Sequence, residues 1–252
     1  TNGGARVGEA LIAATNRGVQ CRVLVDGVGS KRFLKSDLYR EMINAGVQVL
    51  AALDVSPLRM LFARVDLRNH RKIAVIDGTI GYCGSQNLTD ESYRASKRKH
   101  VGPWIDTTAR IEGPAVQPLQ NIFLKDWDCD SEEDLPDLNR YFPPPLRTGG
   151  KSIVQVVPSG PGPQPDTIHQ ALLSMLYSAK QEIIMTTPYF VPDEATKSAL
   201  INAALRGVRV TLVLPDELDL RVVAAASRSH YEDLLEVGVV IMHHLDGLLH
   251  AK

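Results

Sequence analysis

The sequence predicts an α/β protein that contains two copies of one module, and two observations carry this prediction. First, residues 10–19 (ALIAATNRGV) and 199–208 (ALINAALRGV) are identical at seven of ten positions, at a constant offset of 189. Second, each copy has the apolar period of a helix, ends in Arg-Gly, and is followed by a β-rich run, at 21–25 and 210–214. Helices that alternate with β-branched strands are typical of α/β folds.

Composition narrows the classes of protein. The chain has 252 residues, 44% hydrophobic and 23% charged, which is ordinary for a globular protein with one large or two medium domains. Its formal net charge is -1, whereas nucleic-acid binders usually carry a basic excess, so we expect no nucleic-acid partner. The three cysteines have unrelated spacings, and we expect reduced thiols, no metal site and no cofactor.

The repeat extends beyond the shared helix. Residues 38–47 resemble 230–239 at offset 192, and 69–72 align with 249–252 at offset 180, the difference being the longer loop 53–68 of the first copy. The second copy opens with a helix at about 166–179 and a strand at 182–187, whose partners would precede residue 1. Everything after Lys72 lacks a counterpart after Lys252. We therefore expect the chain to be cut short at both ends.

A Pro/Gly-rich stretch separates the two copies. Its turn-forming segments lie at 141–150 and 158–165, on either side of a predicted strand at 152–157. We expect this strand to open the second half. The predicted domains are therefore 1–148 for the first half and 149–252 for the second half.

The chemistry is predicted at residues 70–78 (HRKIAVIDG), which are followed by Gly-Ser-Gln-Asn at 84–87. The alternation of a strand between His70 and Asp77 would place His70 and Lys72 on one face, with Ile73, Ala74 and Val75 packing the strand. Imidazole can act as a nucleophile or proton carrier near neutral pH, and ammonium attracts phosphate oxygens. A second such pair stands in the repeat-equivalent place, at 250 and 252.

The pattern His-x-Lys-x4-Asp-Gly followed by Gly-Ser-x-Asn resembles the signature of the phospholipase D superfamily. Three further segments, 104–107 (WIDT), 111–116 (IEGPAV) and 188–194 (PYFVPDE), look like bacterial cardiolipin synthases. The resemblance covers essentially the whole chain, but the second motif stops at Lys252, without its aspartate, Gly-Ser and asparagine. We therefore expect this chain alone to be poorly active or inactive.

The resemblance implies two pseudo-symmetric α/β/α modules with mixed sheets and an active site at their seam. It also implies transfer of a phosphatidyl group from one phosphatidylglycerol to another through a phosphohistidine, which makes cardiolipin and releases glycerol without a cofactor. Such a protein would act at a membrane surface, associated with the bacterial inner membrane through segments that lie outside this chain. The alternatives are a phospholipase D that uses water as acceptor, a nuclease, and a non-catalytic membrane-associated or binding protein.

Roles for individual residues follow from the same resemblance. We expect His70 to be the nucleophile and His250 the acid/base, although the sequence does not exclude the reverse. Asp106 is expected to orient His70, or else to be a surface aspartate. The remaining predicted site residues are Lys72, Lys252, Ser85 and Asn87 on the phosphoryl oxygens, Asp77 in the motif with a turn role favoured, and Tyr189 at the lipid site or in the core.

Overall fold

The computed structural model describes residues 2–52, 69–90, 102–131, 133–135, 137–146, 149–159, 166–218 and 220–252. These form two compact units. The first contains residues 1–83, 87–90 and 109–156, and the second contains 84–86, 91–108 and 157–252. The predicted α/β class is confirmed, since helices alternate with parallel and antiparallel strand pairs. The predicted boundary at 148 falls at a position outside the described residues and stays a prediction.

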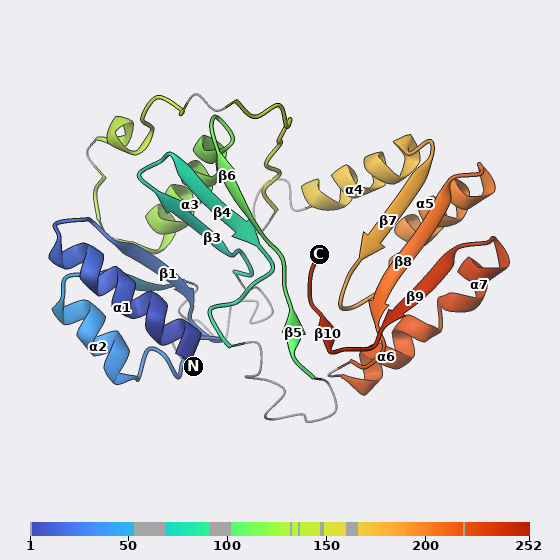
Figure 1. Cartoon of the computed structure of the whole chain (residues 1–252), viewed down its shortest axis with the longest axis horizontal. Coiled ribbons are helices and arrows are strands. Elements are labelled where there is room, and N and C mark those ends of the chain that lie inside the picture. The colour runs from blue at the N-terminus through green and yellow to red at the C-terminus, as the bar shows by residue number, and fades with distance from the viewer. Residues whose placement is uncertain are drawn as a thin grey trace. The chain divides into compact units, whose positions relative to one another are not determined.

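In the first unit, the described residues form two small sheets and three α-helices. Strands β1 and β2 pair in parallel, and β3, β4 and β6 form a second sheet (Figure 1). The elements are α1 (Asn2–Asn16), β1 (Arg22–Asp26), α2 (Asp37–Asn44), β2 (Gln48–Ala52), β3 (Ile73–Ile76), β4 (Ile80–Gly84), β6 (Thr108–Glu112), α3 (Val116–Asp130) and a 3-10 turn, η2 (Leu138–Tyr141).

The second unit has a three-stranded parallel sheet, β7-β8-β9, and a short parallel pair, β10 with β5 (Figure 1). Its main core lies between this sheet and helices α4, α5 and α7. The elements are β5 (Trp104–Ile105), α4 (Thr167–Ser178), β7 (Glu182–Thr186), α5 (Glu194–Leu205), β8 (Arg209–Pro215), α6 (Arg221–Arg228), α7 (Tyr231–Glu236), β9 (Val240–His244) and β10 (Leu248–Leu249).

The repeat is confirmed at the ends of its helices. Gly18 and Gly207 follow α1 and α5 with φ of 88° and 84°, a left-handed conformation that glycine adopts without a Cβ penalty. The amides of Gly18 and Val19 donate to the carbonyls of Thr15 and Ala14, and those of residues 207 and 208 donate to 204 and 203. Each bond therefore recurs at the offset of 189 that the sequence shows.

The repeat is also confirmed in the sheets. Strand β1 pairs with β2 from Arg22↔Gln48 to Asp26↔Ala52, and β8 pairs with β9 from Thr211↔Val240 to Pro215↔His244. Adding 189 to the residue numbers of β1 and 192 to those of β2 gives the register in which β8 pairs with β9. The two halves thus share hydrogen-bond register as well as sequence.

A tight hairpin joins β3 to β4 and confirms the predicted turn at Asp77-Gly78. Both residues have positive φ, 50° and 64°, and the Thr79 amide donates to the Ile76 carbonyl. A Cβ at position 78 would lie 2.6 Å from Pro143 Cδ and 2.7 Å from the Tyr141 carbonyl oxygen, so only glycine fits. The end of η2 and the chain just after it thus pack directly on this turn.

An ion pair joins β1 to the chain after α3 in the first unit. The Arg22 guanidinium donates to both carboxylate oxygens of Glu133, at 3.0 and 2.6 Å, and lies over the rings of Trp127 and Tyr141. These Arg22 bonds, with a further one from Trp127 Nε1, outweigh burial and hold the pKa of Glu133 below its ordinary value. The contact fastens helix α3 to the sheet.

One predicted strand is wrong. Residues 152–157 form no strand, although their β-branched alternation predicted one, and Ile153 is fully exposed. Alternation specifies a strand only where a neighbouring strand accepts its hydrogen bonds, and the described residues offer none here.

The predicted helix at about 166–179 and strand at 182–187 are confirmed as α4 and β7. The loop 53–68 lies outside the described residues.

Candidate active site

The first His-x-Lys pair lies immediately before β3. Because that strand begins at Ile73, His70 and Lys72 are not inside it, and the expected strand from His70 onward is wrong. Ala74 is exposed on β3, so its expected packing role is also wrong. His70 is exposed, and the Lys72 ammonium donates to the His70 carbonyl at 2.7 Å. The pair therefore keeps its lysine next to its histidine without the strand geometry.

The neighbours of His70 are fixed to helix α3. The Arg71 guanidinium donates to both carboxylate oxygens of Asp126, at 2.9 and 2.8 Å. The side-chain amide of Asn69 donates to the same carboxylate at 3.1 Å. The Arg71 amide also donates to the Asn69 side chain. His70 thus lies between two residues that share one carboxylate, which limits how far its backbone can move.

The second pair follows β10 and is anchored by backbone bonds. The amides of His250 and Ala251 both donate to the Ile105 carbonyl, at 2.8 and 3.0 Å. His250 is buried, with 7% of its surface exposed, whereas His70 is exposed. The strand pair β5–β10 therefore brings the second histidine beside the segment 104–108.

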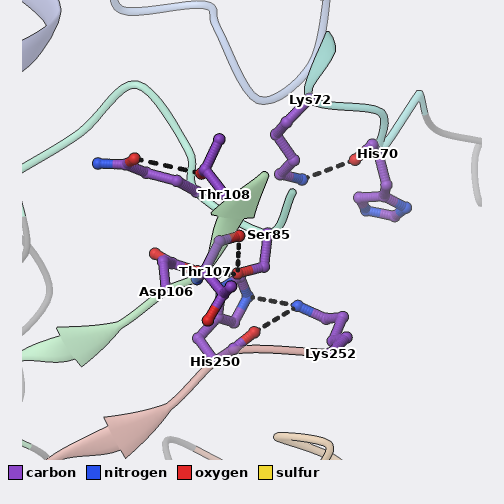
Figure 2. A network of polar contacts seen from close by, with 9 residues as sticks. His70, Lys72, Ser85, Asp106, Thr107, Thr108, His250 and Lys252 are labelled. Atoms are coloured by element: carbon purple, nitrogen blue, oxygen red, sulfur yellow. Dashed lines mark hydrogen bonds and ion pairs between the residues drawn. The ribbon is translucent and has the colours of Figure 1, made fainter. Parts of the chain in front are cut away.

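A chain of polar contacts orients the His250 ring (Figure 2). His250 Nδ1 lies 2.7 Å from Asp106 Oδ1, and the Ser85 hydroxyl donates to the same oxygen at 2.7 Å. The Thr107 amide in turn donates to Ser85 Oγ at 3.0 Å. Asp106 was expected to orient His70, and this expectation is corrected: its carboxylate binds the histidine of the other motif.

Lys252 fixes the tautomer of His250. Its ammonium lies 3.2 Å from His250 Nε2 and donates to the His250 carbonyl at 2.9 Å, as Figure 2 shows. An ammonium has donors only, so Nε2 must accept, and the ring proton is on Nδ1, where it donates to Asp106. In the first motif Lys72 makes the same bond to the carbonyl of its own histidine.

The structure gathers four of the predicted site residues: Ser85, Asp106, His250 and Lys252. Asp77 lies in the turn at the other end of β3 from His70. Asn87 belongs to the first compact unit, and its carbonyl accepts from Thr89. Tyr189 is 36% exposed after β7, while the neighbouring Phe190 is in the core. Among the described residues, no His, Cys, Asp or Glu cluster is suited to a metal ion.

Two residues at this site were not predicted. Trp104 stacks against His250 with ring centroids 4.3 Å apart, and Thr107 holds Ser85 through its amide. Trp104 and Asp106 are two residues apart, the period that puts side chains on one side of an extended chain. That spacing was the available signal. It indicated a shared face but not the histidine that would lie there.

Comparison with known proteins decides the family. The family model described as "Cardiolipin synthase, PLD-like domain" matches residues 4–127 and 172–252. The chain belongs to this family. Cardiolipin synthase A of Serratia proteamaculans (strain 568) is 43% identical over 251 residues, which is 98% of this chain and 51% of that protein. Cardiolipin synthase A of Yersinia pseudotuberculosis serotype O:1b (strain IP 31758) has the same identity and coverage.

A solved structure supports the fold. The phosphatidylserine synthase of Haemophilus influenzae Rd KW20 has a TM-score of 0.52 at 11% identity, over 98% of this chain and 73% of that one. This likeness concerns the fold alone. The chain spans about half the length of the curated cardiolipin synthases that it matches. No helix among the described residues is both long and apolar enough to cross a membrane.

Proposed function

We propose that the protein to which these residues belong is a phosphatidyltransferase that makes cardiolipin from two phosphatidylglycerols and releases glycerol. The observation that carries the proposal is the 2.7 Å contact between Asp106 and His250, the histidine of the second of two His-x-Lys motifs in a cardiolipin synthase-like domain. A carboxylate at Nδ1 stabilises the imidazolium and leaves Nε2 for proton transfer. Such an environment suits a general acid/base.

In the first step, His70 attacks the phosphorus of one phosphatidylglycerol. A nitrogen–phosphorus bond forms, the bond from phosphorus to the glycerol headgroup breaks, and protonated His250 gives its Nε2 proton to the leaving oxygen. The exposed ring of His70 is open to a bulky lipid phosphate, whereas His250 is enclosed and oriented. This contrast supports His70 as nucleophile and His250 as acid/base.

In the second step, neutral His250 removes the proton from a headgroup hydroxyl of a second phosphatidylglycerol. The resulting oxygen attacks phosphorus, the nitrogen–phosphorus bond breaks, and His70 is regenerated. Cardiolipin is the product, and His250 ends with the proton that the next cycle needs. The mechanism requires His70 to reach the phosphorus atom and His250 to reach the oxygen that leaves or attacks it.

Lys72 and Lys252 are assigned to stabilise the negative charge on the phosphoryl oxygens. Each ammonium lies beside its histidine in the structure, from where it can move to a phosphate oxygen. Asn87 is assigned to the same oxygens, and Tyr189 to the lipid. Ser85 is reassigned, because its hydroxyl already binds Asp106 and Thr107, so we propose that it supports the carboxylate. The substrate would reach the site at a membrane surface, to which segments outside these residues would hold the protein.

The test uses the protein together with the coding sequence that flanks these residues. Phosphatidylglycerol in detergent is supplied to the wild type, to His70→Ala and to His250→Ala, and lipid products are identified by mass spectrometry. The proposal expects cardiolipin and glycerol from the wild type, with losses of at least roughly a thousandfold in both variants. Phosphatidic acid without cardiolipin would show hydrolysis instead, and lack of any lipid turnover would contradict the proposal.

A further inference from the structure

The face of the His250 ring is covered by an aromatic side chain. Trp104 lies with its ring centroid 4.3 Å from that of His250 and with the two planes inclined by 32°. Within the described part of the chain, the charged groups at this imidazole include Asp106 at Nδ1 and Lys252 at Nε2, both at the ring edge. The ring therefore has a carboxylate at one nitrogen, an ammonium at the other, and an indole over its face.

The backbone holds this stack in place. Trp104 pairs with Leu248 and Ile105 with Leu249 in the parallel β5–β10 ladder, and the His250 amide donates to the Ile105 carbonyl. Since Trp104 and Asp106 flank Ile105, one short extended segment supplies the backbone acceptor, the carboxylate and the indole. The histidine is thus fixed from three directions by three consecutive residues.

An indole over an imidazole distinguishes its two protonation states. The negative face of the aromatic ring attracts a cation and has little effect on a neutral ring. Stacking therefore favours imidazolium, in the same direction as Asp106, whereas the ammonium of Lys252 at Nε2 favours the neutral ring. These three contacts therefore each contribute to how much of His250 is protonated near neutral pH.

We propose that Trp104 is a positioning residue that holds the His250 ring and favours its imidazolium form. The consequence for catalysis rests on the proposed function, in which protonated His250 donates to the leaving glycerol. The effect on the protonation of His250 does not rest on the proposed function, because it follows from the contact between the two rings alone. Loss of the indole would leave less general acid at neutral pH and a freer ring, with the substrate phosphate still bound.

The test measures the protonation of His250 without turnover. The 252-residue chain is labelled at histidine, and the His250 resonance is assigned by its loss in His250→Gln and followed by NMR as the pH changes. We expect Trp104→Leu to lower the titration midpoint of His250 by about half a pH unit, with Trp104→Phe in between. An unchanged midpoint in a folded Trp104→Leu protein would overturn the proposal.

The second tryptophan provides a matched control and a second readout. Trp127 is buried in the first unit, where its Nε1 donates to Glu133, and Trp127→Phe should leave the His250 midpoint unchanged. This variant also leaves Trp104 as the single tryptophan, since the chain has two. An imidazolium in contact with an indole quenches its fluorescence, so the emission should fall as pH falls through the His250 midpoint.

Adding His250→Gln to the Trp127→Phe protein should abolish the fall in emission. If the fall persisted, the proposed contact between Trp104 and His250 would be contradicted, even if Trp104→Leu failed to fold. In the flanked protein, Trp104→Leu should shift the alkaline limb of the pH–rate profile to lower pH by the same amount, with a larger effect on kcat than on KM. Absence of cardiolipin synthesis together with the expected NMR shift would contradict the proposed function and leave the role of Trp104 intact.

Discussion

At the scale of single residues, the second motif contains a histidine with a charged partner at each of its two ring nitrogens. Asp106 binds Nδ1, Lys252 binds Nε2, and Ser85 connects the carboxylate to the Thr107 amide. The Asp106 side chain is 15% exposed, so its charge is screened little by water. A carboxylate in this position both selects the tautomer and stabilises the protonated ring.

Asp106→Asn tests this role. The amide keeps the size of the side chain but loses the charge, and it can present its NH2 group to Nδ1, which would select the other tautomer. We expect turnover of phosphatidylglycerol to fall by roughly a thousandfold or more, with the alkaline limb of the pH–rate profile moved to lower pH. Steady-state rates measured between pH 5 and pH 9 check both features.

Asp128→Asn is the matched control for Asp106→Asn. Asp128 is exposed on α3, so this substitution makes the same chemical change away from the polar chain of the second motif. Its rate should equal that of the wild type. If Asp106→Asn were equally active, the carboxylate would have no part in proton transfer.

At the scale of elements, the β3–β4 hairpin depends on one glycine. Gly78 has φ of 64°, and a Cβ there would meet the chain at Tyr141 and Pro143. We expect Gly78→Ala to lower the free energy of unfolding by about 2–4 kcal/mol, from backbone strain plus the clash. Urea denaturation measures this loss.

Gly18 supplies the comparison for Gly78. Its φ is 88°, but a Cβ would meet nothing within 4 Å, so Gly18→Ala should cost only the backbone strain, about 1 kcal/mol. Equal losses in the two variants would mean that the segment around Pro143 does not pack on the hairpin.

The attachment of α3 to β1 should depend on pH. Arg22 lowers the pKa of Glu133 from its ordinary 4.5, so this contact stabilises the fold fully above that value and loses its contribution as pH falls through the lower, folded value. Glu133→Gln should therefore be less stable than the wild type at pH 7, and its stability should fall less between pH 5 and pH 3. Urea midpoints across that range check it, and parallel curves for both proteins would contradict the role of the ion pair.

Sequence reasoning succeeded for elements whose pattern is local. The Arg-Gly helix ends, the Asp77-Gly78 turn, α4 and β7 each follow from a few adjacent residues. It failed where the outcome depends on a distant partner. Residues 152–157 have strand propensity, but the part of the chain that the structure describes offers them no neighbouring strand. Asp106 could be matched to either histidine until the β5–β10 ladder was known. The stacking of Trp104 depends on the same ladder.

At the scale of the whole molecule, one module occurs twice with the same register, and each copy carries one His-x-Lys pair. The two copies hold their histidines differently. His70 is anchored through its neighbours to Asp126 and remains exposed, while His250 is buried beside Asp106 and Trp104. This asymmetry is the basis for giving the two histidines different roles in phosphatidyl transfer.

The most direct test of that assignment is to trap the covalent intermediate. The flanked protein carrying His250→Ala is given a phosphatidyl donor with a p-nitrophenol leaving group, which departs without a general acid, and the quenched protein is digested at neutral pH for mass spectrometry. We expect a phosphatidyl group on the peptide that contains His70, and this group should persist because no base activates the acceptor. The assignment would be contradicted by an adduct on His250 in the His70→Ala protein together with no adduct on His70 in the His250→Ala protein.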